Sequence, residues 1–204
     1  MKLFTSGWAP NGRRVAMFLA EKHFEIPEVD VDLEKRENTA AAFVARNALG
    51  RVPVLELDDG THLTESVAIC RYVELLKPEP RLFGREPLEQ ARVEMWNRRA
   101  EINVLIPIAQ AFRSLTPVFK TFEKVVPEWG PVAEEQARDA MPIFETQLGD
   151  NEFLAGDSFS IADITLALTL SFARSTGRNL PYDSPNLSRW FAAVSARPSY
   201  PRRK

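Results

Sequence analysis

The stretch from Gly50 to Ser66 constrains the fold of this chain most, because it holds signals for a strand, a tight turn, a second strand and a helix start. Most residues from Val54 to Leu57 are strand formers, and Asp59-Gly60 is a strong hairpin signal. Glu65-Ser66 then opens a helical pattern of apolar residues. A serine hydroxyl and the free N–H groups of a helix start make an anion site, which suits a carboxylate as well as a phosphate.

The first part of the chain predicts a small α/β layer. Apolar residues alternate between strand and helix spacing, and Gly, Pro and Asn residues separate the segments. The expected order is strand, helix, strand, helix, strand, strand, helix, with a right-handed and parallel first crossover. The sequence therefore predicts a first domain at residues 1–77, whose segments before the hairpin are Lys2–Thr5, Arg13–His23, Glu28–Leu33 and Asn38–Arg46.

Residues 78–87 predict a linker, because this segment holds three prolines and a glycine and cannot continue a helix. Beyond it, residues 88–204 predict an all-helical second domain. Ser160 to Asp163 has the S-x-x-D form of a capping box, worth about 1 kcal/mol, at the start of a buried helix. The expected helices are Leu88–Leu115 with a kink at Pro107, Ala133–Leu148, the buried run at Leu166–Phe172, and Asn186–Ser195.

Composition excludes several classes of function. A formal net charge of −2 argues against a nucleic-acid partner, which would need a basic face. The single cysteine, Cys70, excludes internal disulfides and fits a reducing compartment. We find no apolar run long enough for a membrane span and expect a cytoplasmic protein without a membrane partner. His23 and His62 show no zinc-like pairing, so we expect no metal.

The loop from Ser6 to Gly12 is where chemistry is expected, because open α/β sheets bind ligands at the carboxyl ends of their strands. Two kinds of loop occur at such a place. Neither phosphate-binding glycine motif is present, which argues against a phosphate loop. The alternative is a loop whose polar hydrogens stabilise a thiolate and lower the pKa of the thiol.

A valine-proline pair before the hairpin, Val52-Pro53, followed by Glu65-Ser66 at the helix start, resembles the glutathione-binding half of the cytosolic glutathione transferases. That half has a thioredoxin-like fold, and an all-helical domain follows it. Phe153 to Ile164 is similar to the signature of the second domain. The resemblance implies a cis Val52-Pro53 bond, pairing of the Val52 backbone with the cysteinyl backbone of glutathione, and binding of the γ-glutamyl carboxylate at Glu65-Ser66.

The first loop sharpens the resemblance. Ala9 to Val15 is similar to the loop of the nu-type and prion-like bacterial transferases, and of the fungal type-two transferases with their bacterial relatives. Many classes place a catalytic Ser or Cys one or two residues before the proline, but this chain has Trp8 and Ala9 there. The resemblance therefore implies that Asn11 or Ser6 donates to the thiol. Turn formation or helix capping remains the alternative role of Asn11.

The remaining site residues also follow from the resemblance. Asn38 and Arg51 are expected near the glycyl carboxylate of glutathione. Trp8, Phe112 and Ser114 are expected to line the pocket for the second substrate. The type-two proteins supply a His and a Ser from the segment around Ser114, and here the His is absent, so Ser114 joins the candidates for activating the thiol.

The function implied is that of a glutathione transferase. Glutathione is the expected cosubstrate, and its thiolate attacks a small hydrophobic electrophile or a peroxide in detoxification. The resemblance also implies a homodimer. Two alternatives remain: a transferase-like regulatory or interaction module without efficient catalysis, and a glutathione-dependent isomerase or dehalogenase. The intact Glu65-Ser66 pair argues against the module, which would not need that site.

Overall fold

The computed structural model describes residues 1–178 and 180–201, and these form two compact units. The first unit is Met1–Leu82 together with the described end of the chain from Ser199 on, and the second is Phe83–Pro198. The division lies inside the proline-rich segment where the sequence predicts a linker. Residues 202–204 of the predicted second domain lie outside the described part of the chain.

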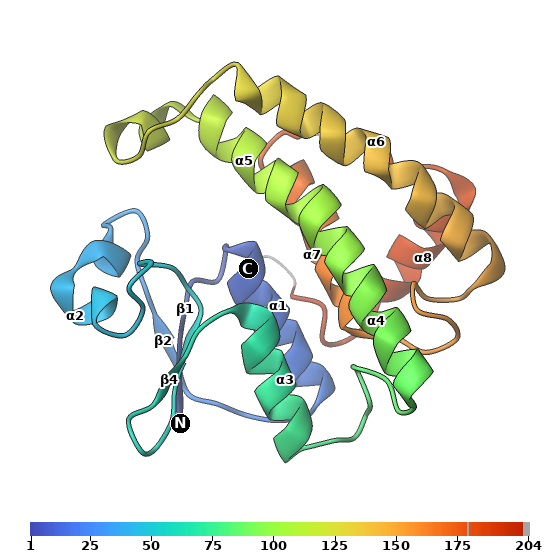
Figure 1. Cartoon of the computed structure of the whole chain (residues 1–204), viewed down its shortest axis with the longest axis horizontal. Coiled ribbons are helices and arrows are strands. Elements are labelled where there is room, and N and C mark those ends of the chain that lie inside the picture. The colour runs from blue at the N-terminus through green and yellow to red at the C-terminus, as the bar shows by residue number, and fades with distance from the viewer. Residues whose placement is uncertain (179, 202–204) are drawn as a thin grey trace. The chain divides into compact units, whose positions relative to one another are not determined.

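A four-stranded sheet organises the first unit, in the order β2-β1-β3-β4 (Figure 1). β1 and β2 are parallel, as the predicted crossover requires, while β1–β3 and β3–β4 are antiparallel. The elements are β1 (Lys2–Thr5), α1 (Pro10–Glu21), β2 (Glu28–Asp30), a 3₁₀ turn (Glu37–Thr39), α2 (Ala41–Val44), β3 (Val54–Glu56), β4 (His62–Leu63) and α3 (Ser66–Leu76).

Helices cover both faces of this sheet. α1 and α3 pack side by side on one face, and α2 lies on the other (Figure 1). Because side chains alternate between the faces of a strand, Val54 packs with Phe43 of α2 while Leu55 is buried toward α1 and α3. The predicted thioredoxin-like fold is confirmed, although α2 is shorter than the predicted helix at residues 38–46.

A buried ion pair joins the end of α1 to α3. Lys22 is fully buried and pairs with Glu74 of α3, and its Nζ donates a hydrogen bond to the carbonyl oxygen of Pro78 at 2.9 Å and to that of Pro80. Glu74 Oε1 in turn accepts a hydrogen bond from the N–H of Leu82 at 3.1 Å. This cluster ties the segment after α3 to the first unit. The sequence analysis did not predict it.

The second unit is all-helical, as predicted. Its elements are α4 (Pro87–Ala100), a π-helix (Glu101–Leu105), α5 (Ile106–Leu115), a 3₁₀ turn (Pro117–Thr121), α6 (Trp129–Asp150), α7 (Ile161–Ser175) and α8 (Pro185–Ser195). α5 and α6 run side by side, and α7 packs against α4 (Figure 1). Nearly every side chain of α7 is buried, which confirms the predicted central helix.

Two prolines, Pro107 and Pro142, lie inside helical stretches of this unit. The helix predicted at residues 88–115 runs without a gap through α4, the π-helix and α5, and the π-helix ends two residues before Pro107. A π-turn is one of the ways in which a helix accommodates a residue that disturbs its hydrogen-bond ladder. Pro142 lies inside α6, which runs unbroken from Trp129 to Asp150.

The predicted capping box starts α7. Oδ2 of Asp163 accepts hydrogen bonds from the N–H and the Oγ of Ser160, both at 2.9 Å. Oδ1 accepts from the N–H of Leu154 at 3.0 Å and from Nε1 of Trp190 at 2.8 Å. Burial raises the pKa of the Asp163 carboxyl, and these four donors oppose that shift. Asp163 thus caps α7 and also holds α8 and the turn before α7.

The described end of the chain returns to the first unit. Nη2 of Arg13 donates to the carbonyl oxygen of Pro201 at 2.7 Å, and the hydroxyl of Ser199 bonds to Glu21. Both partners of the tail lie on α1. The predicted second domain therefore ends before Ser199 in the described chain, because Arg13 and Glu21 hold the last residues.

Candidate functional site

The first loop leads directly into α1. Ala9 is the N-cap, Pro10 the first helical residue and Asn11 the second. Gly12 lets the helix approach β1 closely, because a Cβ there would lie 2.4 Å from Oγ1 of Thr5 and 2.9 Å from the carbonyl oxygen of Ser6. This close approach places Asn11 at the carboxyl end of β1, where the sequence analysis expects chemistry.

Arg14 joins the start of α1 to the start of α3. Its Nη1 donates to Oγ of Ser66 at 2.7 Å and to Oδ1 of Asn11 at 3.2 Å. Oγ of Ser66 and Oδ1 of Asn11 are themselves 3.4 Å apart. Only 1% of Arg14 is exposed to solvent. We call Asn11, Arg14 and Ser66 the α1–α3 cluster.

The guanidinium settles the orientation of the Asn11 amide. Arginine has donors and no acceptor, so the amide atom that faces it must be the oxygen. The nitrogen Nδ2 is then the end that points away from Arg14, and in the part of the chain that the structure describes no hydrogen bond of Nδ2 is found. Asn11 therefore presents a donor outward from a fixed position.

Two helix N-termini meet at this cluster, because Asn11 is the second residue of α1 and Ser66 the first residue of α3. Neither helix carries an acidic residue in its first turn. Helix N-termini carry partial positive charge, and the buried guanidinium adds a full one. The cluster is therefore an electropositive site that favours an anion.

Glu65, the N-cap of α3, has a strained backbone. Its φ of 64° and ψ of 112° lie in a region that residues other than glycine rarely adopt. Such a conformation costs about 1 to 3 kcal/mol and persists where the surroundings enforce it, often at functional sites. The Glu65 side chain is exposed, and the next residue in the chain, Ser66, is buried.

The Val52–Pro53 peptide is cis, as the resemblance implies. The segment before it is held by two side-chain amides. Nδ2 of Asn38 donates to the carbonyl oxygen of Gly50 at 2.8 Å, and Nδ2 of Asn47 donates to that of Arg51 at 2.7 Å. Asn38 thus uses one of its donors on the chain itself. The Arg51 side chain is exposed, so it remains accessible to a ligand.

The candidate Ser6 and the single cysteine, Cys70, are both buried in the first unit. Only 4% of Ser6 is exposed, and its carbonyl oxygen accepts the N–H of Ala9 at 3.1 Å. Cys70 is completely buried on α3, and burial raises the pKa of its thiol to about 12, although the charge of Arg14 opposes the shift. A thiol in that state is inert at neutral pH.

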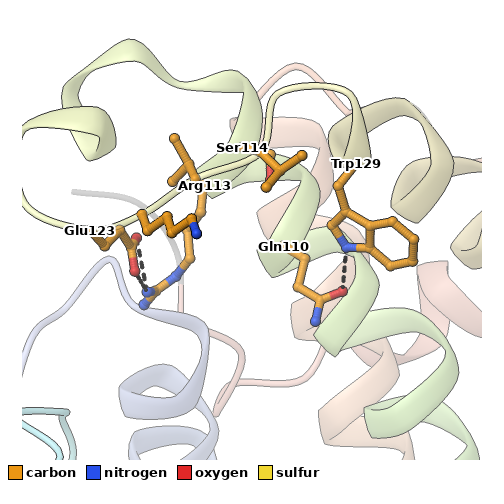
Figure 2. A pocket seen from close by; sticks show the side chains of 8 residues that line it. Gln110, Arg113, Ser114, Glu123 and Trp129 are labelled. Carbon is orange, nitrogen blue, oxygen red and sulfur yellow. Dashed lines mark hydrogen bonds and ion pairs between the residues drawn. The ribbon is translucent and has the colours of Figure 1, made fainter.

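The second unit contains a cavity of about 380 Å³ between α5, the start of α6 and the segment that joins them (Figure 2). Ser114, Gln110 and Trp129 are among its lining residues, together with the ion pair of Arg113 and Glu123. Arg113 Nη1 reaches Glu123 Oε2 at 2.8 Å, and Nε1 of Trp129 donates to Oε1 of Gln110 at 3.1 Å. Much of the polar lining is therefore paired within the cavity.

The three residues predicted for the second-substrate pocket lie in different surroundings. Ser114 lines this cavity, whereas Phe112 packs edge-on against Phe119 and Phe172. Residues two apart on a helix point in nearly opposite directions, which accounts for the separation. Trp8 belongs to the first unit and is 46% exposed.

Arg14 is a functional residue that was not predicted from the sequence. The available signal was its spacing, because residues three apart on a helix lie on one face and Arg14 follows Asn11 by three. Among the described residues no cluster of three His, Cys, Asp or Glu side chains is placed to hold a metal ion. No helix of the described chain is both long and apolar enough to cross a membrane.

Comparisons with known proteins agree with this architecture. The glutathione S-transferase N-terminal domain family matches residues 1–74, and the C-terminal domain family matches residues 109–198. Glutathione S-transferase 2 of Saccharomyces cerevisiae is 36% identical over 98% of this chain and 87% of its own length.

Solved structures are similar over nearly the whole chain. A glutathione S-transferase domain-containing protein from Marinobacter aquaeolei superposes with a TM-score of 0.93 at 37% identity, over 98% of this chain and 100% of that one. A class Gtt2 glutathione S-transferase from Vibrio parahaemolyticus gives 0.86 at 37% identity, over 98% and 95%. Both domain families, this identity and this fold together show that the chain belongs to the glutathione S-transferase family of enzymes.

Proposed function

We propose that this transferase binds glutathione on its first unit and presents the thiolate to a small hydrophobic electrophile. The observation that carries the proposal is the α1–α3 cluster, in which two helix N-termini and a buried guanidinium converge on a serine hydroxyl and an amide donor. A peptide with a terminal carboxylate and a thiol that must ionise has the charges that such a site favours.

The two charged groups on the α-carbon of the γ-glutamyl residue suit Glu65 and Ser66. The Ser66 hydroxyl and the N–H groups of the first turn of α3 donate to the carboxylate, while the Glu65 carboxylate accepts from the ammonium group. The backbone of Val52, before the cis proline, pairs with the cysteinyl backbone, and Asn38 and Arg51 serve the glycyl carboxylate. Arg51 is the more accessible of the two.

Calorimetry with glutathione tests the carboxylate site. We expect Ser66→Ala to weaken binding about ten- to a hundredfold, because a lost hydrogen bond to a charged partner costs about 1.5 to 3 kcal/mol. Thr61→Ala removes an exposed hydroxyl from the preceding hairpin and should leave the affinity unchanged. If Ser66→Ala binds as tightly as the parent, the carboxylate lies elsewhere.

The thiol is activated from the start of α1. Asn11 presents its amide N–H outward, and a donor to sulfur favours the thiolate and lowers its pKa. Asn11→Ala should therefore raise the kinetic pKa of bound glutathione and slow conjugation. If Ser6→Ala or Ser114→Ala shifts the pH profile and Asn11→Ala does not, one of those serines is the donor.

The second substrate is a small hydrophobic electrophile or a peroxide, and the proposed role is detoxification in the cytoplasm. Trp8, Phe112 and Ser114 are the proposed pocket, of which Ser114 lines a cavity. A panel of electrophiles and peroxides assayed with glutathione measures which reaction dominates. We propose further that the enzyme is a homodimer, and a monomeric mass by light scattering at micromolar concentration would contradict this.

A transferase-like module without efficient catalysis is the second candidate function. Ala9 favours it, because this chain lacks a hydroxyl or thiol directly before Pro10. Turnover separates the two candidates: a module would bind glutathione and fail to conjugate any member of the electrophile panel.

A further inference from the structure

We propose that Arg14 is a positioning residue that couples the carboxylate end of the glutathione site to its thiol end. The inference rests on the proposed function, because it assigns Ser66 to the carboxylate and Asn11 to the thiol. A single nitrogen atom of Arg14, Nη1, contacts both residues. Each terminal nitrogen of a guanidinium carries two hydrogens, so Nη1 can donate one to each oxygen at the same time.

Burial makes this contact rigid. Only 1% of Arg14 is exposed, so water does not compete for its hydrogens. The guanidinium is planar, and its donors have fixed directions. The hydrogens of Nη1 therefore point in fixed directions toward the oxygens of Asn11 and Ser66, although Arg14 and Ser66 are 52 residues apart in the sequence.

At Asn11 the contact decides which end of the amide faces outward. With Oδ1 directed to Arg14, the NH₂ group is the end left for a ligand. Without this anchor, only the long contact with the Ser66 hydroxyl would hold the amide oxygen inward, and the amide would be less well directed. A carbonyl oxygen repels a thiolate, so the anchor determines whether Asn11 can help the thiol to ionise.

At Ser66 the contact decides where the hydroxyl hydrogen goes. Oγ accepts from Arg14 at 2.7 Å, and its own hydrogen faces Oδ1 of Asn11 at 3.4 Å, which is a long hydrogen bond. A carboxylate is a stronger hydrogen-bond acceptor than an amide, so a bound carboxylate accepts the hydrogen bond from Ser66 in place of Asn11. One guanidinium thus prepares a donor for each end of the ligand.

A lysine would not serve in this way. Its ammonium is a compact charge on a flexible stem and lacks the planar array of donors. Arg14→Lys therefore keeps the charge and removes the geometry. Arg13 provides a matched control, because it is the adjacent residue on α1, is also buried and donates to the carbonyl oxygen of Pro201 in the tail.

The test is conjugation of glutathione to a chloronitrobenzene over a range of pH, with KM for glutathione and kcat measured separately. Arg14→Lys should raise KM about tenfold, as for a lost charge-assisted hydrogen bond. It should also raise the kinetic pKa of the bound thiol by about 1 unit. Arg13→Lys should change neither quantity.

A double substitution separates positioning from direct action. If Arg14 acts on the thiol through Asn11, then Arg14→Lys combined with Asn11→Ala should have the same kinetic pKa as Asn11→Ala alone. Shifts that add would overturn the proposal, because Arg14 would then act independently. A loss of thermal stability without any change in the pH profile would also overturn it.

Ser66→Ala supplies a second variant in case Arg14→Lys does not fold. Loss of Oγ removes one of the two oxygens between which Nη1 is held, so the Asn11 amide becomes less well directed. At saturating glutathione, the kinetic pKa of the bound thiol in Ser66→Ala should rise, but by less than in Asn11→Ala. An unchanged kinetic pKa overturns the coupling. If glutathione affinity in Ser66→Ala is unchanged, the carboxylate lies elsewhere, and the site proposed at Ser66 is wrong rather than the coupling alone.

Discussion

Two buried polar clusters, one in each unit, differ in how their hydrogen bonds are used. Around Asp163, four donors of the chain converge on two carboxylate oxygens at the start of α7. In the α1–α3 cluster the helix starts have no carboxylate of their own in the first turn, and Asn11 directs an amide nitrogen outward. A cluster completed by its own chain stabilises the fold, whereas one that lacks its anion is suited to bind a ligand.

The Lys22–Glu74 pair extends the comparison within the first unit. Lys22 is satisfied by Glu74 and by two backbone carbonyl oxygens, so it resembles the Asp163 cluster although it lies in the same unit as the candidate site. A cluster is therefore completed by its own chain, or left able to bind a ligand, according to its hydrogen bonds. It does not matter which of the two units contains the cluster.

Asp163→Ala should cause the largest loss of stability, about 3 to 5 kcal/mol, because it leaves several buried donors of the chain without an acceptor. Thermal or urea unfolding measures the loss. The folded fraction should bind glutathione as the parent does. Ser160→Ala, which removes only one of the hydrogen bonds, should cost about 1 kcal/mol.

Lys22→Met should cost a comparable amount, about 3 kcal/mol or more, because Glu74 is then a buried charge without its partner. Adding Glu74→Leu to Lys22→Met should restore much of the stability, since replacing both charges of a buried pair is often nearly neutral. A double variant as unstable as the single one would show that the contacts to Pro78 and Pro80 matter more than the charges.

Glu65→Gly should relieve the backbone strain at this position and at the same time weaken glutathione binding. Glycine adopts a φ of 64° without strain, so the variant should be more stable than Glu65→Ala by about 1 kcal/mol. Both variants should bind glutathione less tightly than the parent, because both lack the carboxylate. Equal stability of the two variants would mean that the strain at Glu65 is small.

Ionisation of the Cys70 thiol should have the smallest effect on stability at neutral pH. Its thiol pKa, raised to about 12 by burial, means that the folded protein keeps this proton above the ordinary thiol pKa of 9.0. Stability is therefore intact below pH 9 and falls as pH rises toward 12, by at most about 1.4 kcal/mol per pH unit. Iodoacetamide should label Cys70 only after unfolding, and labelling of the native protein at pH 8 would contradict this.

Local signals in the sequence predicted much of the fold. The turn at Asp59-Gly60, the capping box at Ser160 and the proline-rich segment each act over a few residues, so their meaning does not depend on the rest of the chain. Ser66 was predicted in the same way, from its place at a helix start, whereas the predicted role of Glu65 came from the resemblance. The π-helix before Pro107 was missed, because proline alone does not indicate how the preceding turn adapts.

The sequence by itself determined the order of the elements and the residue types at the helix starts, because periodicity and capping are properties of neighbouring residues. Tertiary structure alone decided which of those residues meet. Arg14 reaches Ser66 across 52 residues, and Lys22 reaches Glu74 across the same sequence distance, only because α1 and α3 pack on one face of the sheet. A buried arginine and a solvated one look alike in a sequence, and the difference between them is set by the packing around the guanidinium.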